Sequence, residues 1–359
     1  MSVLVGNSDF RPLPTNPTAK ITGVHESLLQ ECEKDIIWYR EHFVGKAHHN
    51  YLAVDSPRGP LAISLIHDAS ASTFKVLVRS TQGSERLTVA AQSVPNPWWR
   101  KAMGLLPTNE SVMQTVSSNI PLQCLKHCKE TSKSNLPNEL LAMEERQVIR
   151  SYKFGLTYLG SGQATEEEMF SNKHEHTSQG FKQFLNFLGE TIELKGWKGY
   201  RAGLDTQSNN TGTHSVYTKW QGYEVMFHVA TMLPYAEKDR QQLERKRHVG
   251  NDIVVIVYQD TDTPYQLSTN TSHQNHIIAV VQPCGEGYKL CLAPKNGVPP
   301  FSPEMPEPPI FFKDAVSRDF FFHKLINGER ACYKAPSFAP KISRTRQVLL
   351  TELATKFIK

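Results

Sequence analysis

Residues 244–258 read ERKRHVGNDIVVIVY, a basic stretch followed directly by an apolar one. The polar residues from Lys238 to Lys246 favour a helix, and the β-branched run from Ile253 to Tyr258 predicts a buried strand. Gly250 and Asn251 lie at the junction, and both residue types tolerate the left-handed conformation that ends helices. A helix that leads directly into a buried strand indicates an α/β sheet covered by helices.

The same alternation continues on both sides of this junction. Apolar stretches predict further strands, and the spacing of Phe181, Phe184, Leu185 and Leu188 predicts a helix over 178–188. An amphipathic helix is predicted over 343–358. The further strands are predicted at 154–159, 225–229, 277–281 and 288–292. We therefore expect an α/β domain, with a central mixed sheet flanked by helices, over residues 146–359.

The first part of the chain has a different pattern. Residues 1–25 carry Pro and Gly among small polar residues, which predicts a flexible or extended arm. A helix is predicted over 26–42, and three strands are predicted at 61–66, 74–78 and 87–90. Residues 108–138 are too irregular to assign. We expect a smaller α+β domain over residues 26–145.

Composition excludes several classes of protein. The chain has 359 residues, 39% of them hydrophobic, and a net charge of +5, which disfavours a nucleic-acid-binding module. Six scattered cysteines, with neither a signal peptide nor a spanning segment in the sequence, predict free thiols and a cytoplasmic location. Cys124 and Cys128 lack the second ligand pair that a structural zinc needs. Because the chain ends directly after an amphipathic helix, we expect it to be an excerpt of a longer protein.

Asn251 is the residue with the most specific chemistry. A carboxamide offers one acceptor and two donor hydrogens, so it can hold a water molecule and a phosphate oxygen together without ionising. Such a group suits the positioning of a water for attack on a phosphate. The alternative is that Gly250 and Asn251 are only a helix stop. Because no phosphate-binding loop or dinucleotide fingerprint is present, we expect the chain itself to bind no nucleotide.

A series of segments, in this order, resembles the Rap/Ran-GAP domain family, including its signal-induced proliferation-associated and Rap/Ran-GAP domain-like branches. WYREHFVGK at 38–46 resembles the smaller domain that precedes the catalytic domain in that family. The segments of the catalytic domain are YKFG (152–155), EEEMFS (166–171), FLNFLG (184–189), GYRAGLD (199–205), TGTHSVY (211–217), MFHVATMLPY (226–235), RHVGNDIV (247–254) and FFFHKLINGE (320–329).

The resemblance implies a GTPase-activating protein for a Rap-type small GTPase in its GTP form. Members of this family lend an asparagine to a partner that lacks its own water-positioning glutamine, and that asparagine falls on Asn251. The resemblance makes His248 a supporting residue. It implies that the partner carries the GTP and Mg²⁺, and that the chain needs neither a cofactor nor a metal of its own. Recruitment to membranes that carry the lipid-anchored GTPase would follow, without insertion of the chain itself.

Four basic residues match family positions that contact the GTPase or brace the site: Lys153, Lys246, Arg247 and Arg344. Arg245 we interpret as a solvated charge on the helix, and His214 and His228 as structural residues rather than metal ligands. The resemblance also implies that the N-terminal domain pairs two chains. Two alternatives remain open, a non-catalytic scaffold that binds a GTPase or dimerises, and an activator of another small GTPase such as Rheb.

Overall fold

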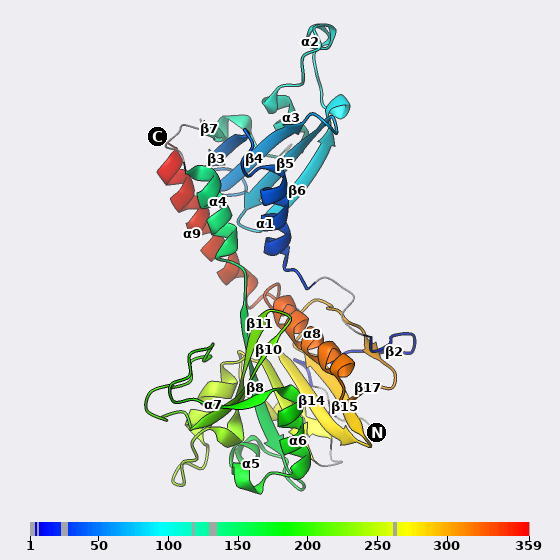
Figure 1. Cartoon of the computed structure of the whole chain (residues 1–359), viewed down its shortest axis with the longest axis vertical. Helices are drawn as coiled ribbons and strands as arrows, with labels where there is room; N and C mark the ends of the chain where they lie inside the picture. Colours follow the sequence, from blue (N-terminus) through cyan, green and yellow to red (C-terminus); the bar gives the residue numbers. More distant parts are fainter. Residues whose placement is uncertain are drawn as a thin grey trace. The chain divides into compact units, whose positions relative to one another are not determined.

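The computed structural model describes residues 4–5, 7–22, 28–116, 119–128, 135–260 and 264–358. The chain divides into two compact units (Figure 1). The larger unit comprises residues 1–28 and 149–336, and the smaller unit comprises residues 29–148 and 337–359. The chain crosses between the units three times, after residues 28, 148 and 336. The predicted boundaries at 25/26 and 145/146 lie within a few residues of the first two crossings, whereas the sequence does not predict the third, before the last helix.

The larger unit is built on an eight-stranded mixed sheet. Three neighbouring pairs are parallel, namely β11 with β8, β8 with β12 and β12 with β14, and the remaining pairs are antiparallel. The strand order is β17 (Ile310–Phe312), β15 (Gly287–Pro294), β14 (Ile277–Cys284), β12 (Val254–Gln259), β8 (Ser151–Leu159), β11 (Tyr223–Val229), β10 (His214–Trp220) and β9 (Glu190–Glu193). The predicted mixed sheet flanked by helices is confirmed.

Helices cover both faces of this sheet. On one face, aromatic side chains of α6 (Gln179–Leu188) and α8 (Ala315–Cys332) pack on strand residues, as in the contacts of Phe181 with Tyr258 and of Phe322 with Phe227. On the other face, α5 (Glu166–Phe170) and α7 (Leu243–Gly250) contribute to an apolar cluster that includes Val249. Three residues separate the end of α7 from the start of β12, so the helix–strand junction is tight.

The N-terminal residues that the structure describes pair with the larger unit. β1 (Leu4–Val5) runs parallel to β13 (Tyr265–Gln266), and β2 (Thr15–Asn16) runs parallel to β16 (Met305–Pro306). Phe10 forms an isolated bridge with Lys295. The described part of the predicted arm is thus extended and paired, while residues 1–3, 6 and 23–25 of that arm lie outside the described residues, as do residues 26–27 of the predicted first helix.

The smaller unit is a five-stranded antiparallel sheet with helices on its faces. Its strand order is β6 (Gly83–Ala90), β5 (Thr73–Ser80), β4 (Leu61–Asp68), β3 (His49–Ala53) and β7 (Lys126–Cys128). Figure 1 shows α1 (Glu31–His42), α4 (Leu136–Glu145) and α9 (Ala339–Phe357) over one face. α3 (Asn109–Val116) packs on the opposite face through Val112 and Met113. The short helix α2 (Trp98–Ala102) follows β6 in the chain.

The last helix belongs to the smaller unit, whereas the sequence predicts one domain over residues 146–359. Its apolar side chains Leu350 and Leu353 pack with Leu140 of α4 and Leu52 of β3. Arg346 of α9 is 5% exposed.

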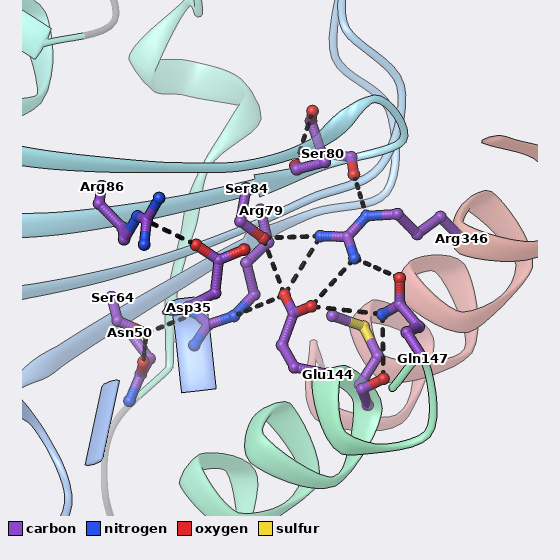
Figure 2. A network of polar contacts seen from close by, with 12 residues as sticks. Asp35, Asn50, Ser64, Arg79, Ser80, Ser84, Arg86, Glu144, Gln147 and Arg346 are labelled. Atoms are coloured by element: carbon purple, nitrogen blue, oxygen red, sulfur yellow. Dashed lines mark hydrogen bonds and ion pairs between the residues drawn. The ribbon is translucent and has the colours of Figure 1, made fainter. Parts of the chain in front are cut away.

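Figure 2 shows how the Arg346 guanidinium joins α9 to this unit. It lies 3.0 Å from Oε2 of Glu144, and its Nε donates to the main-chain oxygen of Ser80 at 2.8 Å. Arg79, which is fully buried, lies 3.5 Å from the same Glu144 carboxylate. A charge buried in this way requires its partners, so α9 is an integral part of the smaller unit. No local sequence pattern carries that information.

Within the described residues, no helix is both long enough and apolar enough to cross a membrane.

Candidate functional site

Asn251 directly follows the last residue of α7. Its backbone has φ −94° and ψ 4°, and its N–H donates to the main-chain oxygen of His248 at 3.2 Å. This conformation is the one common at the end of a helical turn, so Asn251 needs no left-handed backbone. The residue is exposed. The helix therefore ends by presenting a carboxamide to solvent.

Two side chains from the loop before β14 satisfy the carbonyl groups at this helix end. Ser272 Oγ donates to the main-chain oxygen of Gly250 at 2.6 Å. Asn275, which is 3% exposed, donates through Nδ2 to the main-chain oxygen of Val249 at 3.2 Å and to that of Asp252 at 2.5 Å. The final carbonyls of a helix have no partner inside the helix. Their capture by the Ser272 and Asn275 side chains fixes the turn that carries Asn251.

Lys153 of β8 fixes the main chain of Asn251 itself. Its Nζ donates to the main-chain oxygen of Asn251 at 3.0 Å and lies 3.0 Å from Oδ1 of Asp252. The Asp252 carboxylate is fully buried, and Oδ2 lies 2.8 Å from Nδ1 of His228. The other ring nitrogen of His228 lies 3.0 Å from the main-chain oxygen of Ala202. Both ring nitrogens of His228 thus face acceptors, so the ring is fixed between the Asp252 carboxylate and the main chain of Ala202.

A glycine in the central strand makes room for this junction. In the sheet, Gly155 of β8 lies between His228 of β11 and Val255 of β12. A Cβ atom at Gly155 would lie 2.8 Å from Cγ1 of Val249 and 3.2 Å from Oδ2 of Asp252. Any side chain here would push the end of α7 away from the sheet. The absence of one lets α7 approach closely enough for Lys153 and His228 to hold Asp252.

His248 lies one turn before Asn251 and is half-buried. Its ring packs edge-on against the ring of His228, with 5.3 Å between the centroids. Burial lowers the pKa of His248, and the nearby His228 and Arg247 lower it further. A neutral imidazole at neutral pH follows, which leaves His248 without charge beside the carboxamide.

Glu329 of α8 is a second buried carboxyl group whose charge state is linked to this cluster. Burial raises its pKa to about 7, and the negative charge of Asp252 adds to that effect, while Tyr333 and Lys153 act in the opposite direction. Tyr333 donates to Oε1 at 2.8 Å, whereas the buried Oε2 has no hydrogen-bond partner. The carboxyl group is therefore partly protonated at neutral pH.

The predicted basic residues fall into different environments. Lys246 forms an ion pair with Glu166 of α5 at 3.0 Å and is partly buried. Within the described residues, Arg247 forms an ion pair with its exposed neighbour Glu244 alone, at 2.8 Å, and is 64% exposed. Arg344 is exposed on α9, in the smaller unit. Lys153, Lys246, Arg247, His248 and Asn251 therefore lie together at one helix end, and Arg344 belongs to the other unit.

Two family models match the chain. The model described as Rap/ran-GAP matches residues 169–347, and the model described as Rap/Ran-GAP protein dimerization domain matches residues 36–130. GTPase-activating Rap/Ran-GAP domain-like protein 3 of Gallus gallus is 39% identical over 360 residues, which cover 97% of this chain and 37% of that protein. The chain belongs to the Rap/Ran-GAP family.

A second branch of the Rap/Ran-GAP family is also similar. Signal-induced proliferation-associated 1-like protein 2 of Mus musculus is 36% identical over 351 residues, which cover 93% of this chain and 20% of that protein. The chain thus spans well under half the length of these relatives. Among solved structures, that of the TSC2 GAP domain matches with a TM-score of 0.41 and 25% identity, covering 57% of this chain and 99% of that chain.

The interpretation of Arg245 as a solvated charge is wrong. In this Rap/Ran-GAP chain Arg245 is 2% exposed. Its guanidinium donates to the main-chain oxygens of Phe170 and Asn172, both at 2.7 Å, and to that of Leu233 at 2.8 Å. Arg245 therefore joins α7 to two segments beside it. Burial lowers its pKa to about 10, so it stays charged at neutral pH.

The sequence points to Asn251 and to Lys153, but not to the other residues that hold the turn at Asn251. Asp252 was part of the quoted segment RHVGNDIV without a role, and His228, interpreted as structural, proves to be its partner. Ser272 and Asn275 lie in a polar stretch that gave no signal. One clue was available, because a polar Asp directly before an apolar strand is costly to bury without a partner.

The arrangement offers little chemistry of its own. Among the residues that the structure describes, no group of three or more His, Cys, Asp or Glu side chains is placed to hold a metal ion. The Rap/Ran-GAP site provides the exposed carboxamide of Asn251. Hydrogen bonds from the side chains of Lys153, Ser272 and Asn275 hold the main chain around it. Such a group can align a water molecule, provided that another molecule brings the reacting bond.

Proposed function

We propose that this chain accelerates GTP hydrolysis by a Rap-type small GTPase, with Asn251 inserted into the partner's active site to orient the attacking water. The observation that carries the proposal is the exposed side-chain carboxamide of Asn251 in a chain of the Rap/Ran-GAP family. Lys153 holds the main-chain oxygen of the same residue. The relative in Gallus gallus is named a GTPase-activating protein, which supports the same function.

The chemistry of GTP hydrolysis suits such a contribution. Transfer of the phosphoryl group to water requires alignment of the water and stabilisation of charge, with little covalent assistance. A partner without its own water-positioning glutamine needs that amide from outside. The carboxamide of Asn251 would accept a hydrogen from the water and donate to a phosphate oxygen. Completing a GTPase site in this way is worth up to about 10⁵-fold in rate.

Alignment requires a rigid support, and the residues under Asn251 supply it. Lys153, Ser272 and Asn275 hold the helix end through hydrogen bonds to main-chain oxygens. In the proposal these three residues position Asn251 and do not touch the nucleotide. His248 supports the carboxamide as a neutral ring, because its lowered pKa disfavours the imidazolium. A general base is not required for this loose transition state.

The basic residues serve binding rather than chemistry in this proposal. Arg247 is exposed, and its ion-pair partner within the described residues is the exposed Glu244. We assign Arg247 to contact with the acidic surface of the GTPase. Lys246 braces the site through Glu166. We also assign Arg344, which is exposed on α9 of the smaller unit, to contact with the GTPase. Arg245 cannot reach a phosphate, because its donors are engaged by buried carbonyls.

We also propose that the partner brings the GTP and the Mg²⁺, so that the chain needs no cofactor. The family model described as a dimerization domain, over residues 36–130, supports a homodimer formed through the smaller unit.

Single-turnover phosphate release tests the proposed activity. Rap loaded with GTP is mixed with increasing amounts of the chain, and Rheb and Ran are tested in parallel. We expect a large acceleration with Rap that saturates as the complex forms. Acceleration only with Rheb or Ran would assign a different substrate. Saturable binding to Rap without acceleration of GTP hydrolysis would show that the proposed activity is wrong. It would favour the alternative, a non-catalytic scaffold that binds the GTPase.

A further inference from the structure

The largest exposed apolar group of the smaller unit lies on the loop after β6. Of the fifteen large apolar side chains that are exposed among the described residues, five fall within residues 98–106. They are Trp98, Trp99, Met103, Leu105 and Leu106, with Trp98 80% and Met103 61% exposed. Scattered apolar side chains on a surface need no explanation, but a contiguous group marks a contact site. We call residues 95–107 the Trp98 loop.

The Trp98 loop is held in shape by its own contacts. Val94 and Pro107 are buried at its base. Asn96 Nδ2 donates to the main-chain oxygen of Leu105 at 2.9 Å, and Arg100 Nη2 donates to that of Leu106 at 2.9 Å. Figure 1 shows α2 at the tip of this loop, projecting beyond the strands of the small sheet. The two tryptophans are therefore presented on a preformed convex tip.

The charges of the loop indicate the kind of partner. Residues 91–108 contain Arg100 and Lys101 and no Asp or Glu. Tryptophan suits the boundary between lipid headgroups and acyl chains, since one part of its ring is apolar and its N–H is polar. Lys and Arg beside it are attracted to anionic headgroups. A lipid surface is deformable, so it can accept the convex tip without a preformed complementary pocket.

A second copy of the chain fits this tip less well. In a symmetric pair the same patch meets itself, so Arg100 and Lys101 would face their own copies. With no acidic residue in the loop to compensate them, these like charges would repel.

We propose that the Trp98 loop is a peripheral membrane contact that binds anionic phospholipid through shallow insertion of Trp98 and Met103. One small loop gives weak, reversible binding, which a second copy in the same assembly would strengthen.

Co-sedimentation of the full chain with vesicles tests this contact. The vesicles are made of phosphatidylcholine alone or of equimolar phosphatidylcholine and phosphatidylserine. We expect binding to the mixed vesicles, weakened by salt, and a loss of about tenfold or more for the double variant Trp98→Ser, Met103→Ser. Lys101→Glu should weaken binding to the mixed vesicles only. The matched control is Ile342→Ser, Val348→Ser, which removes two exposed apolar side chains of α9 in the same unit and should bind like the wild type.

Two further measurements keep the result interpretable. The thermal midpoint of each variant shows whether it is folded, and sedimentation equilibrium without lipid gives its oligomeric state. A wild-type chain that stays in the supernatant with both kinds of vesicle overturns the proposal. Vesicle binding that the Trp98 variant retains also overturns it. If the variant instead turns a dimer into a monomer without changing vesicle binding, the loop is a contact between copies and the lipid assignment is wrong.

Discussion

Lys153 on β8 donates a hydrogen bond of 3.0 Å to the main-chain oxygen of Asn251 at the end of α7. The two residues are 98 positions apart in the sequence, yet the parallel pairing of Val254 with Phe154 brings the start of β12 beside Lys153. The same ammonium group neutralises the buried Asp252. One side chain thus connects the sheet to the backbone of the residue that we propose completes the partner's active site.

Replacing Lys153 by Met removes this connection while keeping much of the side chain's apolar stem. We expect the maximal single-turnover rate to fall by about 10- to 100-fold, because a small displacement of a positioning group has a large effect on rate. The affinity for the GTPase should change little. Lys153→Arg, which restores the charge, should recover part of the rate. A variant with weakened affinity and an unchanged maximal rate would instead make Lys153 a docking residue.

Asn275→Ala removes the donor that serves two buried main-chain oxygens, those of Val249 and Asp252. Unsatisfied buried acceptors cost about 1–3 kcal/mol, so the free energy of unfolding should decrease by that amount in urea titrations. The rate of GTP hydrolysis should also fall under conditions where the variant is folded. Ser272→Ala is the smaller change, because Ser272 Oγ donates to one main-chain oxygen, that of Gly250, and accepts from the N–H of Gln274. Full activity of folded Asn275→Ala would show that this cap does not position Asn251.

Arg245 and Arg247 give a matched pair on one helix. Arg245→Ala leaves the main-chain oxygens of Phe170, Asn172 and Leu233 without this hydrogen-bond donor. We expect the substitution to lower the free energy of unfolding by about 3–4 kcal/mol. Arg247→Ala should change stability by less than about 0.5 kcal/mol, since Arg247 is exposed. The latter variant should weaken binding to the GTPase. Equal stability of the two variants in denaturant titrations would contradict the role given to Arg245.

The pH dependence of stability should report Glu329. Its pKa is raised from 4.5 to about 7, so the folded state binds the proton more tightly than the unfolded state does. This contribution is fully present below pH 4.5 and is lost as the pH rises to about 7, a change on the order of 3 kcal/mol. Relative to the wild type, Glu329→Gln should therefore become more stable as the pH is raised from about 5 to 8. The exposed Glu237→Gln should show no such trend.

The sequence predicts the central strands because their apolar residues form continuous or alternating runs. β12 is the clearest example, and β8, β11, β14 and β15 follow the same rule. The sequence does not predict β10, because HSVYTKW mixes polar and aromatic residues and contains no continuous apolar run. α8 was not predicted either. Its residues FFFHKLI are buried all round, so no helical periodicity distinguishes one face from the other.

The site was only partly predictable for a related reason. Asn251 stands at a junction that local pattern reveals. Its supports depend on strand register, on the missing side chain at Gly155 and on carbonyls that converge from distant segments. The burial of Arg245 is set by main-chain oxygens at 170, 172 and 233, which no helical pattern encodes. Likewise, α9 joins the smaller unit through the pairing of Arg346 with Glu144, a contact between residues 202 positions apart.

The most direct measurement compares the wild type with Asn251→Ala in single-turnover hydrolysis of GTP on Rap, together with the affinity of each for Rap. The control is Asn186→Ala, which changes an exposed asparagine on α6. We predict that Asn251→Ala abolishes the acceleration while binding to Rap largely survives, and that Asn186→Ala behaves like the wild type. Acceleration that survives Asn251→Ala would contradict the proposed mechanism and direct attention to Arg247 and Arg344.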